Sequence, residues 1–130
     1  MSHATTERPV LQPGPKHPIT IEPNPSRVLV RVDGKVVADT RNALTLREAS
    51  YAPVQYVPLE DVDASLLTAT DHATYCPFKG DASYYTITAG EDGENAVWEY
   101  REPYEAVAAI KGHVAFYADR VELTEEPPAS

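Results

Sequence analysis

The placement of proline restricts what this chain can fold into. Six of the twelve prolines lie within the first 25 residues. Proline lacks a backbone N–H donor and restricts the residue before it, so this segment excludes a helix or a central strand. We therefore predict an extended, partly disordered N-terminal tail over residues 1–16, one folded domain over residues 17–124 and a frayed C-terminal tail over residues 125–130.

The folded part reads as a series of short β-strands. Val28–Val32 and Lys35–Asp39 are rich in β-branched residues, and the Asp33-Gly34 pair between them favours a two-residue type I′ hairpin turn. Further runs typical of strands are 43–48, 53–57, 83–88, 96–100 and 114–123, the last with a bend. Helical patterns occur at 61–68 and 102–112. The sequence predicts a mainly β domain with one or two short helices.

Composition excludes several classes of partner. With 130 residues and 42% hydrophobic content, the chain builds one core. Its net charge of -9 repels phosphate backbones and anionic lipids, so we expect neither a nucleic-acid nor a membrane partner. No apolar run reaches the roughly 20 residues of a spanning helix, and the start lacks a secretory signal, which favours a cytoplasmic location.

The one cysteine limits covalent and metal chemistry. Cys76 is alone, so the chain forms no intramolecular disulfide and no four-thiolate zinc site. His72, Cys76 and His113 offer a set for metal binding or for a Cys-His pair, but their spacing matches neither well. We predict no metal site and no cofactor.

Tyrosine is concentrated in the second half of the chain. All eight tyrosines lie between Tyr51 and Tyr117, with Trp98 among them. Such rings line ligand cavities, where they stack on planar groups and hydrogen-bond their edges, but strands also favour tyrosine for packing alone. Adjacent Tyr84 and Tyr85 point to opposite faces of a strand, so at most one of them faces a given pocket.

The Cys76-Pro77-Phe78-Lys79-Gly80 segment has the pattern of a tight loop that leads into a strand. It presents a thiol and an ammonium group together. The thiol is either a nucleophile activated by Lys79 or a buried free cysteine, and Lys79 either binds an anionic ligand group or stays solvated. Downstream, six acidic residues crowd residues 91–105, which indicates a solvated acidic rim rather than an acid–base pair.

Four ordered motifs, at residues 56–62, 76–85, 98–103 and 114–117, resemble the bacterial domain-of-unknown-function 427 family. The resemblance extends over residues 17–122 and implies a metal-free fold of the β-tent type. It implies no established activity. A nucleotidyltransferase label is sometimes attached to the family, but no Gly-Ser pair of that enzyme type occurs here. Leu59 stands where the family often has an arginine.

These features favour a small-molecule-binding module. Its ligand pocket would combine rings, which cover a planar part of the ligand, with a lysine that neutralises an anionic group. The candidate ligand-binding residues are Tyr56, Cys76, Lys79, Tyr84, Trp98 and Tyr100. One alternative is an enzyme that uses Cys76 as nucleophile or Lys79 as electrostatic stabiliser. Another is a protein-interaction module that docks a partner on an exposed strand edge.

Overall fold

The computed structural model of the protein describes residues 8–128, and its regular structure is almost entirely β. The prediction of a mainly β domain is confirmed. The strands are β1 (Ile19–Asn24), β2 (Arg27–Val32), β3 (Lys35–Thr40), β4 (Ala43–Glu48), β5 (Val54–Pro58), β6 (Leu67–Cys76), β7 (Gly80–Ile87), β8 (Val97–Tyr100), β9 (His113–Phe116) and β10 (Glu122–Glu126).

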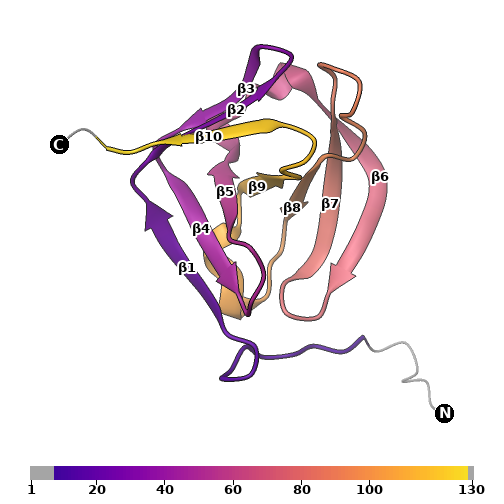
Figure 1. The fold of residues 1–130 in the computed structure, drawn as a ribbon. Coiled ribbons are helices and arrows are strands. Elements are labelled where there is room, and N and C mark those ends of the chain that lie inside the picture. Colours follow the sequence, from indigo (N-terminus) through magenta and orange to yellow (C-terminus); the bar gives the residue numbers. More distant parts are fainter. Residues whose placement is uncertain (1–7, 129–130) are drawn as a thin grey trace.

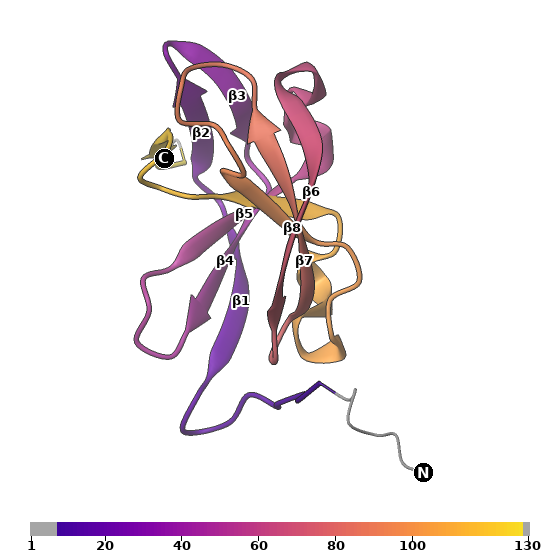
Figure 2. The ribbon, with the colours of Figure 1, turned by 90° about the vertical axis from the view of Figure 1, so that its right-hand side faces the viewer.

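The strands form two antiparallel sheets (Figure 1). The larger sheet has the order β1-β4-β5-β9-β8-β7-β6, and the smaller has the order β10-β2-β3. Turned by 90°, the molecule shows β1, β4 and β5 diverging from β6, β7 and β8 like two walls that meet along one edge (Figure 2). The two halves of the larger sheet therefore face each other, with room for side chains between them.

The predicted Asp33-Gly34 turn joins β2 to β3. Both residues have positive φ, 50° at Asp33 and 80° at Gly34, as a type I′ turn requires. Val32 and Lys35 pair directly across the turn. The turn therefore has the conformation that its two residues predict.

Two strands were not predicted, and one predicted strand was wrong. β6 is mostly polar, and the short alternation of Ile19 and Ile21 in β1 lies within the proline-rich segment and ends at Pro23. β1 lies at a sheet edge, where proline is tolerated. Residues 114–123 do not form one bent strand. The chain turns after Phe116, where the N–H of Arg120 donates to the Tyr117 carbonyl at 2.9 Å. β9 and β10 therefore belong to different sheets.

The predicted helices are short 3₁₀ segments. The 61–68 pattern contains one single turn, Ala64–Leu66, and another, Leu59–Asp61, ends where the pattern begins. Its last two residues, Leu67 and Thr68, belong to β6. The 102–112 pattern corresponds to Glu105–Ile110, which is interrupted at Val107 by a φ of -124°. Within residues 8–128 there is no helix of the length and apolar character needed to cross a membrane.

The core consists of two clusters of buried side chains. One surrounds Val30, Val57 and Val97, where the two sheets meet. The other includes Tyr56, Tyr84 and Tyr100, packed with aliphatic residues between the two walls of the larger sheet. Three of the six candidate ligand-binding residues therefore belong to the second cluster.

The described residues of the two terminal segments both make contacts with the domain. Residues 1–7 lie outside the described residues, but residues 8–16 lie across the turn between β6 and β7. The Arg8 guanidinium pairs with the Asp81 carboxylate, and the N–H of Leu11 donates to the Pro77 carbonyl at 3.0 Å. At the other end, β10 continues to Glu126 and so includes two residues of the segment expected to be the C-terminal tail.

Candidate functional site

Five of the six candidate residues line a single cavity of about 280 Å³ between the two walls of the larger sheet. They are Tyr56 on β5, Lys79 in the β6–β7 turn, Tyr84 on β7, and Trp98 and Tyr100 on β8. We call this cavity the aromatic pocket. It unites residues from four different parts of the chain, and therefore exists only in the folded protein.

Strand pairing brings the rings to the same face. Tyr84 on β7 lies opposite Trp98 on β8, so both point into the aromatic pocket. Tyr85 points to the other face, as its place next to Tyr84 predicts, and its hydroxyl donates to the Glu99 carboxylate at 2.6 Å.

Contacts between the rings hold their orientations. The Trp98 indole N–H donates to the Tyr56 hydroxyl at 3.2 Å, and the two rings meet edge to face. Tyr117 packs against the other side of Trp98 with ring centroids 4.6 Å apart. The Tyr84 hydroxyl is hydrogen-bonded to the Thr74 hydroxyl at 2.8 Å. A ligand therefore meets walls that are already ordered, which lowers the entropic cost of binding.

Sequence reasoning missed more than half of the lining. The additional residues are Leu46, Glu48, Tyr51, Ala52, Val54 and Tyr117. Tyr51 and Tyr117 are 67% and 40% exposed, so they stand at the mouth of the pocket. The alternation of β4 predicts that Leu46 and Glu48 share one face of the strand. Only the pairing of β4 with β5 shows that this face lines the pocket.

A chain of ion pairs and hydrogen bonds closes the base of the pocket. The Lys79 ammonium contacts one Glu48 oxygen at 2.5 Å, and these side chains are only 10% and 14% exposed. The other Glu48 oxygen lies 2.7 Å from Nε2 of His17, whose ring stacks on Phe78 at a centroid distance of 4.0 Å. Lys79 and Glu48 together carry no net charge, so the lysine attracts an anion less strongly than an unpaired ammonium would.

Burial and hydrogen bonding determine the charge states around the base. Burial acts to raise the pKa of Glu48, but hydrogen bonds from Lys79 and His17 outweigh it and hold that pKa below its ordinary value. Burial raises the pKa of Tyr56 and of Tyr100 well above the ordinary value of a phenol. Both hydroxyls therefore keep their protons at physiological pH and can act as hydrogen-bond donors toward the cavity.

Cys76 does not line the cavity. Its Sγ lies 3.8 Å from Nζ of Lys79, and its side chain packs against the second core cluster. His72 packs its ring against Tyr84 at 4.5 Å, and Nδ1 of His113 lies 2.9 Å from the Lys111 carbonyl oxygen. Among residues 8–128, no three His, Cys, Asp or Glu side chains are grouped as a metal ion would require. The histidines and the cysteine thus form no common site in the described part of the chain.

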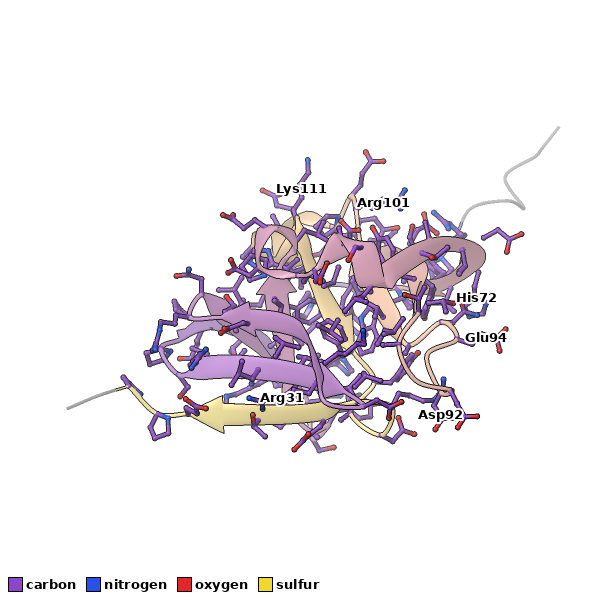
Figure 3. All side chains as sticks on the ribbon, turned by 90° about the horizontal axis from the view of Figure 1, so that it is seen from above. Arg31, His72, Asp92, Glu94, Arg101 and Lys111 are labelled. Atoms are coloured by element: carbon purple, nitrogen blue, oxygen red, sulfur yellow. The ribbon has the colours of Figure 1, made fainter. Side chains whose placement is uncertain are left out.

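The acidic residues 91–105 are mostly on the surface. Figure 3 shows Asp92 and Glu94 projecting outward from the loop between β7 and β8, and Glu91, Glu102 and Glu105 are exposed as well. Glu99 is the exception, since it is buried and accepts a hydrogen bond from Tyr85. Glu91 and Asp92 line one surface cavity and Glu105 lines another, so the six carboxylates do not converge on a single site.

Comparison with known families identifies the chain. Residues 20–127 match the family described as "Domain of unknown function (DUF427)", which is most of the chain. The protein therefore belongs to this family. It matches none of the curated proteins with which it was compared.

Proposed function

We propose that this member of the domain of unknown function 427 family is a binding module for a small planar molecule, which it takes up in the aromatic pocket. The observation that supports this function is the convergence of Tyr56, Lys79, Tyr84, Trp98 and Tyr100 on one cavity of about 280 Å³. This volume suits a single ring system with a short substituent. Stacking against tyrosine and tryptophan faces supplies most of the affinity.

The polar groups at the base favour a ligand with a neutral hydrogen-bond acceptor. Lys79 keeps one donor beyond its contacts with Glu48 and Cys76, and the Tyr56 and Tyr100 hydroxyls remain protonated donors. Glu48 uses both of its oxygens within the protein. The charge of Lys79 is already balanced by that of Glu48. A ligand carboxylate would be repelled by Glu48, so a neutral carbonyl oxygen is the better hydrogen-bond partner for Lys79. This replaces the anionic ligand group that the sequence suggested.

The single tryptophan of the chain gives a direct test, because Trp98 forms part of the pocket wall. Benzamide, benzoate and benzylammonium share one ring and differ in the charge of the substituent. We expect benzamide to change Trp98 fluorescence with saturation and to raise the unfolding temperature, benzoate to bind more weakly, and benzylammonium to bind least. A panel of planar amides that leaves both signals unchanged would refute the proposed function.

Two lysine substitutions locate the contact. Lys79→Met keeps the aliphatic part of the side chain and removes its donors, so benzamide affinity should fall about three- to tenfold, as the loss of one hydrogen bond predicts. Lys111→Met removes an exposed lysine outside the pocket and should leave affinity unchanged. If the two variants bind benzamide with equal affinity, the amide group does not contact Lys79.

A further inference from the structure

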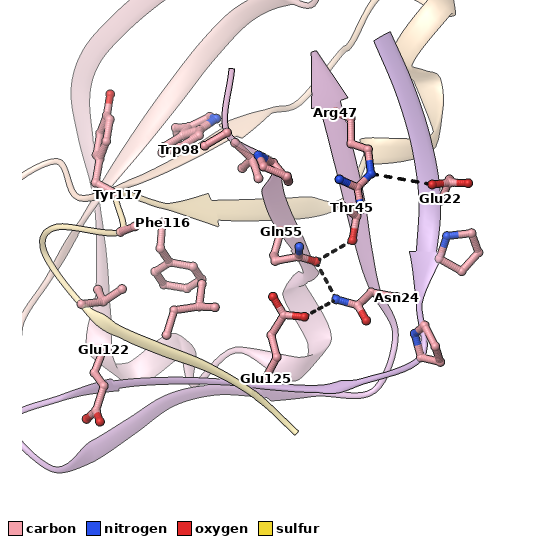
Figure 4. A pocket seen from close by; sticks show the side chains of 18 residues that line it. Glu22, Asn24, Thr45, Arg47, Gln55, Trp98, Phe116, Tyr117, Glu122 and Glu125 are labelled. Atoms are coloured by element: carbon pink, nitrogen blue, oxygen red, sulfur yellow. Dashed lines mark hydrogen bonds and ion pairs between the residues drawn. The ribbon is translucent and has the colours of Figure 1, made fainter. Parts of the chain in front are cut away.

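A second and larger cavity adjoins the aromatic pocket. Its volume is about 900 Å³, and we call it the outer groove. Residues of β1, β4 and β5 form one side, and residues between Phe116 and Glu125 form the other (Figure 4). Four residues line both cavities: Ala52, Val54, Trp98 and Tyr117. The two cavities are therefore neighbours with a common wall.

The cavities lie on opposite faces of β4 and β5. Along β4, Leu46 and Glu48 line the aromatic pocket, whereas Thr45 and Arg47 line the outer groove. A route between the cavities must therefore pass the edge of β5. On that edge β5 pairs with β9 only at its last two residues, so the segment from Val54 to Tyr56 has no strand beside it there. The Trp98 side chain covers this gap, since its indole donates to the Tyr56 hydroxyl, and Tyr117 packs against Trp98.

The outer groove combines apolar side chains with a network of polar side chains that hydrogen-bond one another. Gln55 accepts hydrogen bonds from Asn24 and Thr45 at 2.9 Å each, and Asn24 also donates to Glu125 at 3.0 Å (Figure 4). The remaining wall includes Phe116, Val121 and Leu123 among its apolar side chains. Such a surface gains free energy by covering apolar atoms rather than by new hydrogen bonds.

The charges of the outer groove exclude an anionic occupant. Glu22, Glu122 and Glu125 contribute three carboxylates to its lining, against the single guanidinium of Arg47, which lies 3.9 Å from Glu22. Glu122 is directed away from the polar network, toward the rim (Figure 4). An alkyl chain without a terminal acid is compatible with this charge distribution, whereas a fatty-acid-like tail that ends in a carboxylate is not.

We propose that the ligand is elongated, with a planar neutral head in the aromatic pocket and an uncharged alkyl chain that passes Trp98 and Tyr117 into the outer groove. This inference rests on the proposed function, since it assigns the head to the same pocket. It adds the chemical class of the ligand, a ring amide or related carbonyl compound with an apolar tail. Tyr117 then covers the chain where it leaves the pocket, at the gap beside β5.

A homologous series of probes tests the tail. Benzamide and its 4-ethyl, 4-butyl and 4-hexyl derivatives carry the same head and an increasing number of methylenes. Binding is followed through Trp98 fluorescence, and each buried methylene should tighten the dissociation constant by up to about fourfold. The matched variant is Ala118→Phe, which fills the outer groove only, and its control is Ala108→Phe, an exposed residue that lines neither cavity.

The outcomes separate the two proposals. We expect the control to keep the gain with chain length, and the Ala118→Phe variant to bind benzamide normally while losing most of that gain. If benzamide binds but chain length has no effect, or if the gain is equal in both variants, the tail is not in the outer groove and this inference is wrong. If no member of the series binds, the proposed function itself is wrong.

Discussion

At the residue scale, the site depends on how Glu48 is shared between Lys79 and His17. The aromatic members of the site could be predicted because their residue type, ring chemistry and strand position all point to a pocket. Glu48 and His17 could not. Glu48 reads as an ordinary charged residue at a strand end, and His17 follows a proline-rich segment; only the folding of distant segments brings them to Lys79. The ion pairing of Lys79, and with it the net charge at the base of the pocket, could therefore not be predicted from the sequence.

This sharing makes stability depend on pH in a defined direction. The pKa of Glu48 lies below its ordinary value of 4.5 in the folded protein. The contribution of ionised Glu48 to the free energy of unfolding is fully present above pH 4.5. It is lost as the pH falls through the lower pKa that Glu48 has in the folded protein. Urea unfolding from pH 7 to pH 3 should therefore show that Glu48→Gln is about 3 kcal/mol less stable than the wild type at pH 7. The difference should shrink on acidification.

The Asp39→Asn variant is the control for this measurement. Asp39 forms an ion pair with Arg27, and the hydrogen bond from Arg27 lowers the pKa of Asp39. The Arg27 and Asp39 side chains are 36% and 42% exposed, much more than those of Lys79 and Glu48. Solvent screens an exposed pair, so its loss should cost much less at every pH. A Glu48→Gln curve that runs parallel to the wild-type curve down to pH 3 would contradict the assigned role of Glu48.

At the element scale, short turns decide where the functional side chains lie. Asp33-Gly34 was predictable because its conformation depends only on two residues. The 114–123 segment was not, because nothing local distinguishes a bent strand from two strands that join different sheets. The turn at Lys79 is an intermediate case: its glycine indicated a tight loop, but the direction of the lysine depends on how β7 packs.

Gly80 ends the turn that carries Lys79, and we expect it to resist substitution. Its φ is +113°, a backbone conformation that residues with a side chain rarely adopt, whereas a Cβ there would meet the Glu102 carbonyl oxygen at an ordinary contact distance of 3.4 Å. Gly80→Ala should therefore lower the free energy of unfolding by about 2–3 kcal/mol. Gly112→Ala is the matched control, since Gly112 also has positive φ, +78°, but open space around it, and should cost about 1 kcal/mol. Urea unfolding of both variants measures the difference, and equal costs would show that the more extreme φ of Gly80 adds no strain.

At the scale of the whole molecule, β10 joins the smaller sheet to the outer groove. It pairs with β2 along its length, while Glu125 contacts Asn24 of the larger sheet. Composition predicted one small domain and the strand patterns predicted a β fold. No pattern showed that the last strand would pair with β2 and also line the outer groove. The pairing of β10 with β2 joins residues roughly a hundred positions apart, and such contacts leave no local trace in a sequence.

Removal of this strand should therefore affect both stability and the site. A chain that ends at Arg120 loses Val121 and Leu123, which pack against the core, and leaves β2 without its outer neighbour. We expect the free energy of unfolding to fall by about 4 kcal/mol or more, because two partly buried aliphatic side chains and a set of strand hydrogen bonds disappear. Trp98 loses part of the wall beside it, so its fluorescence emission should move to longer wavelength even in the folded state. A chain that ends at Glu126 keeps all of β10 and should match the wild type in both measurements; if both truncations behave alike, β10 is dispensable for the domain and for the groove.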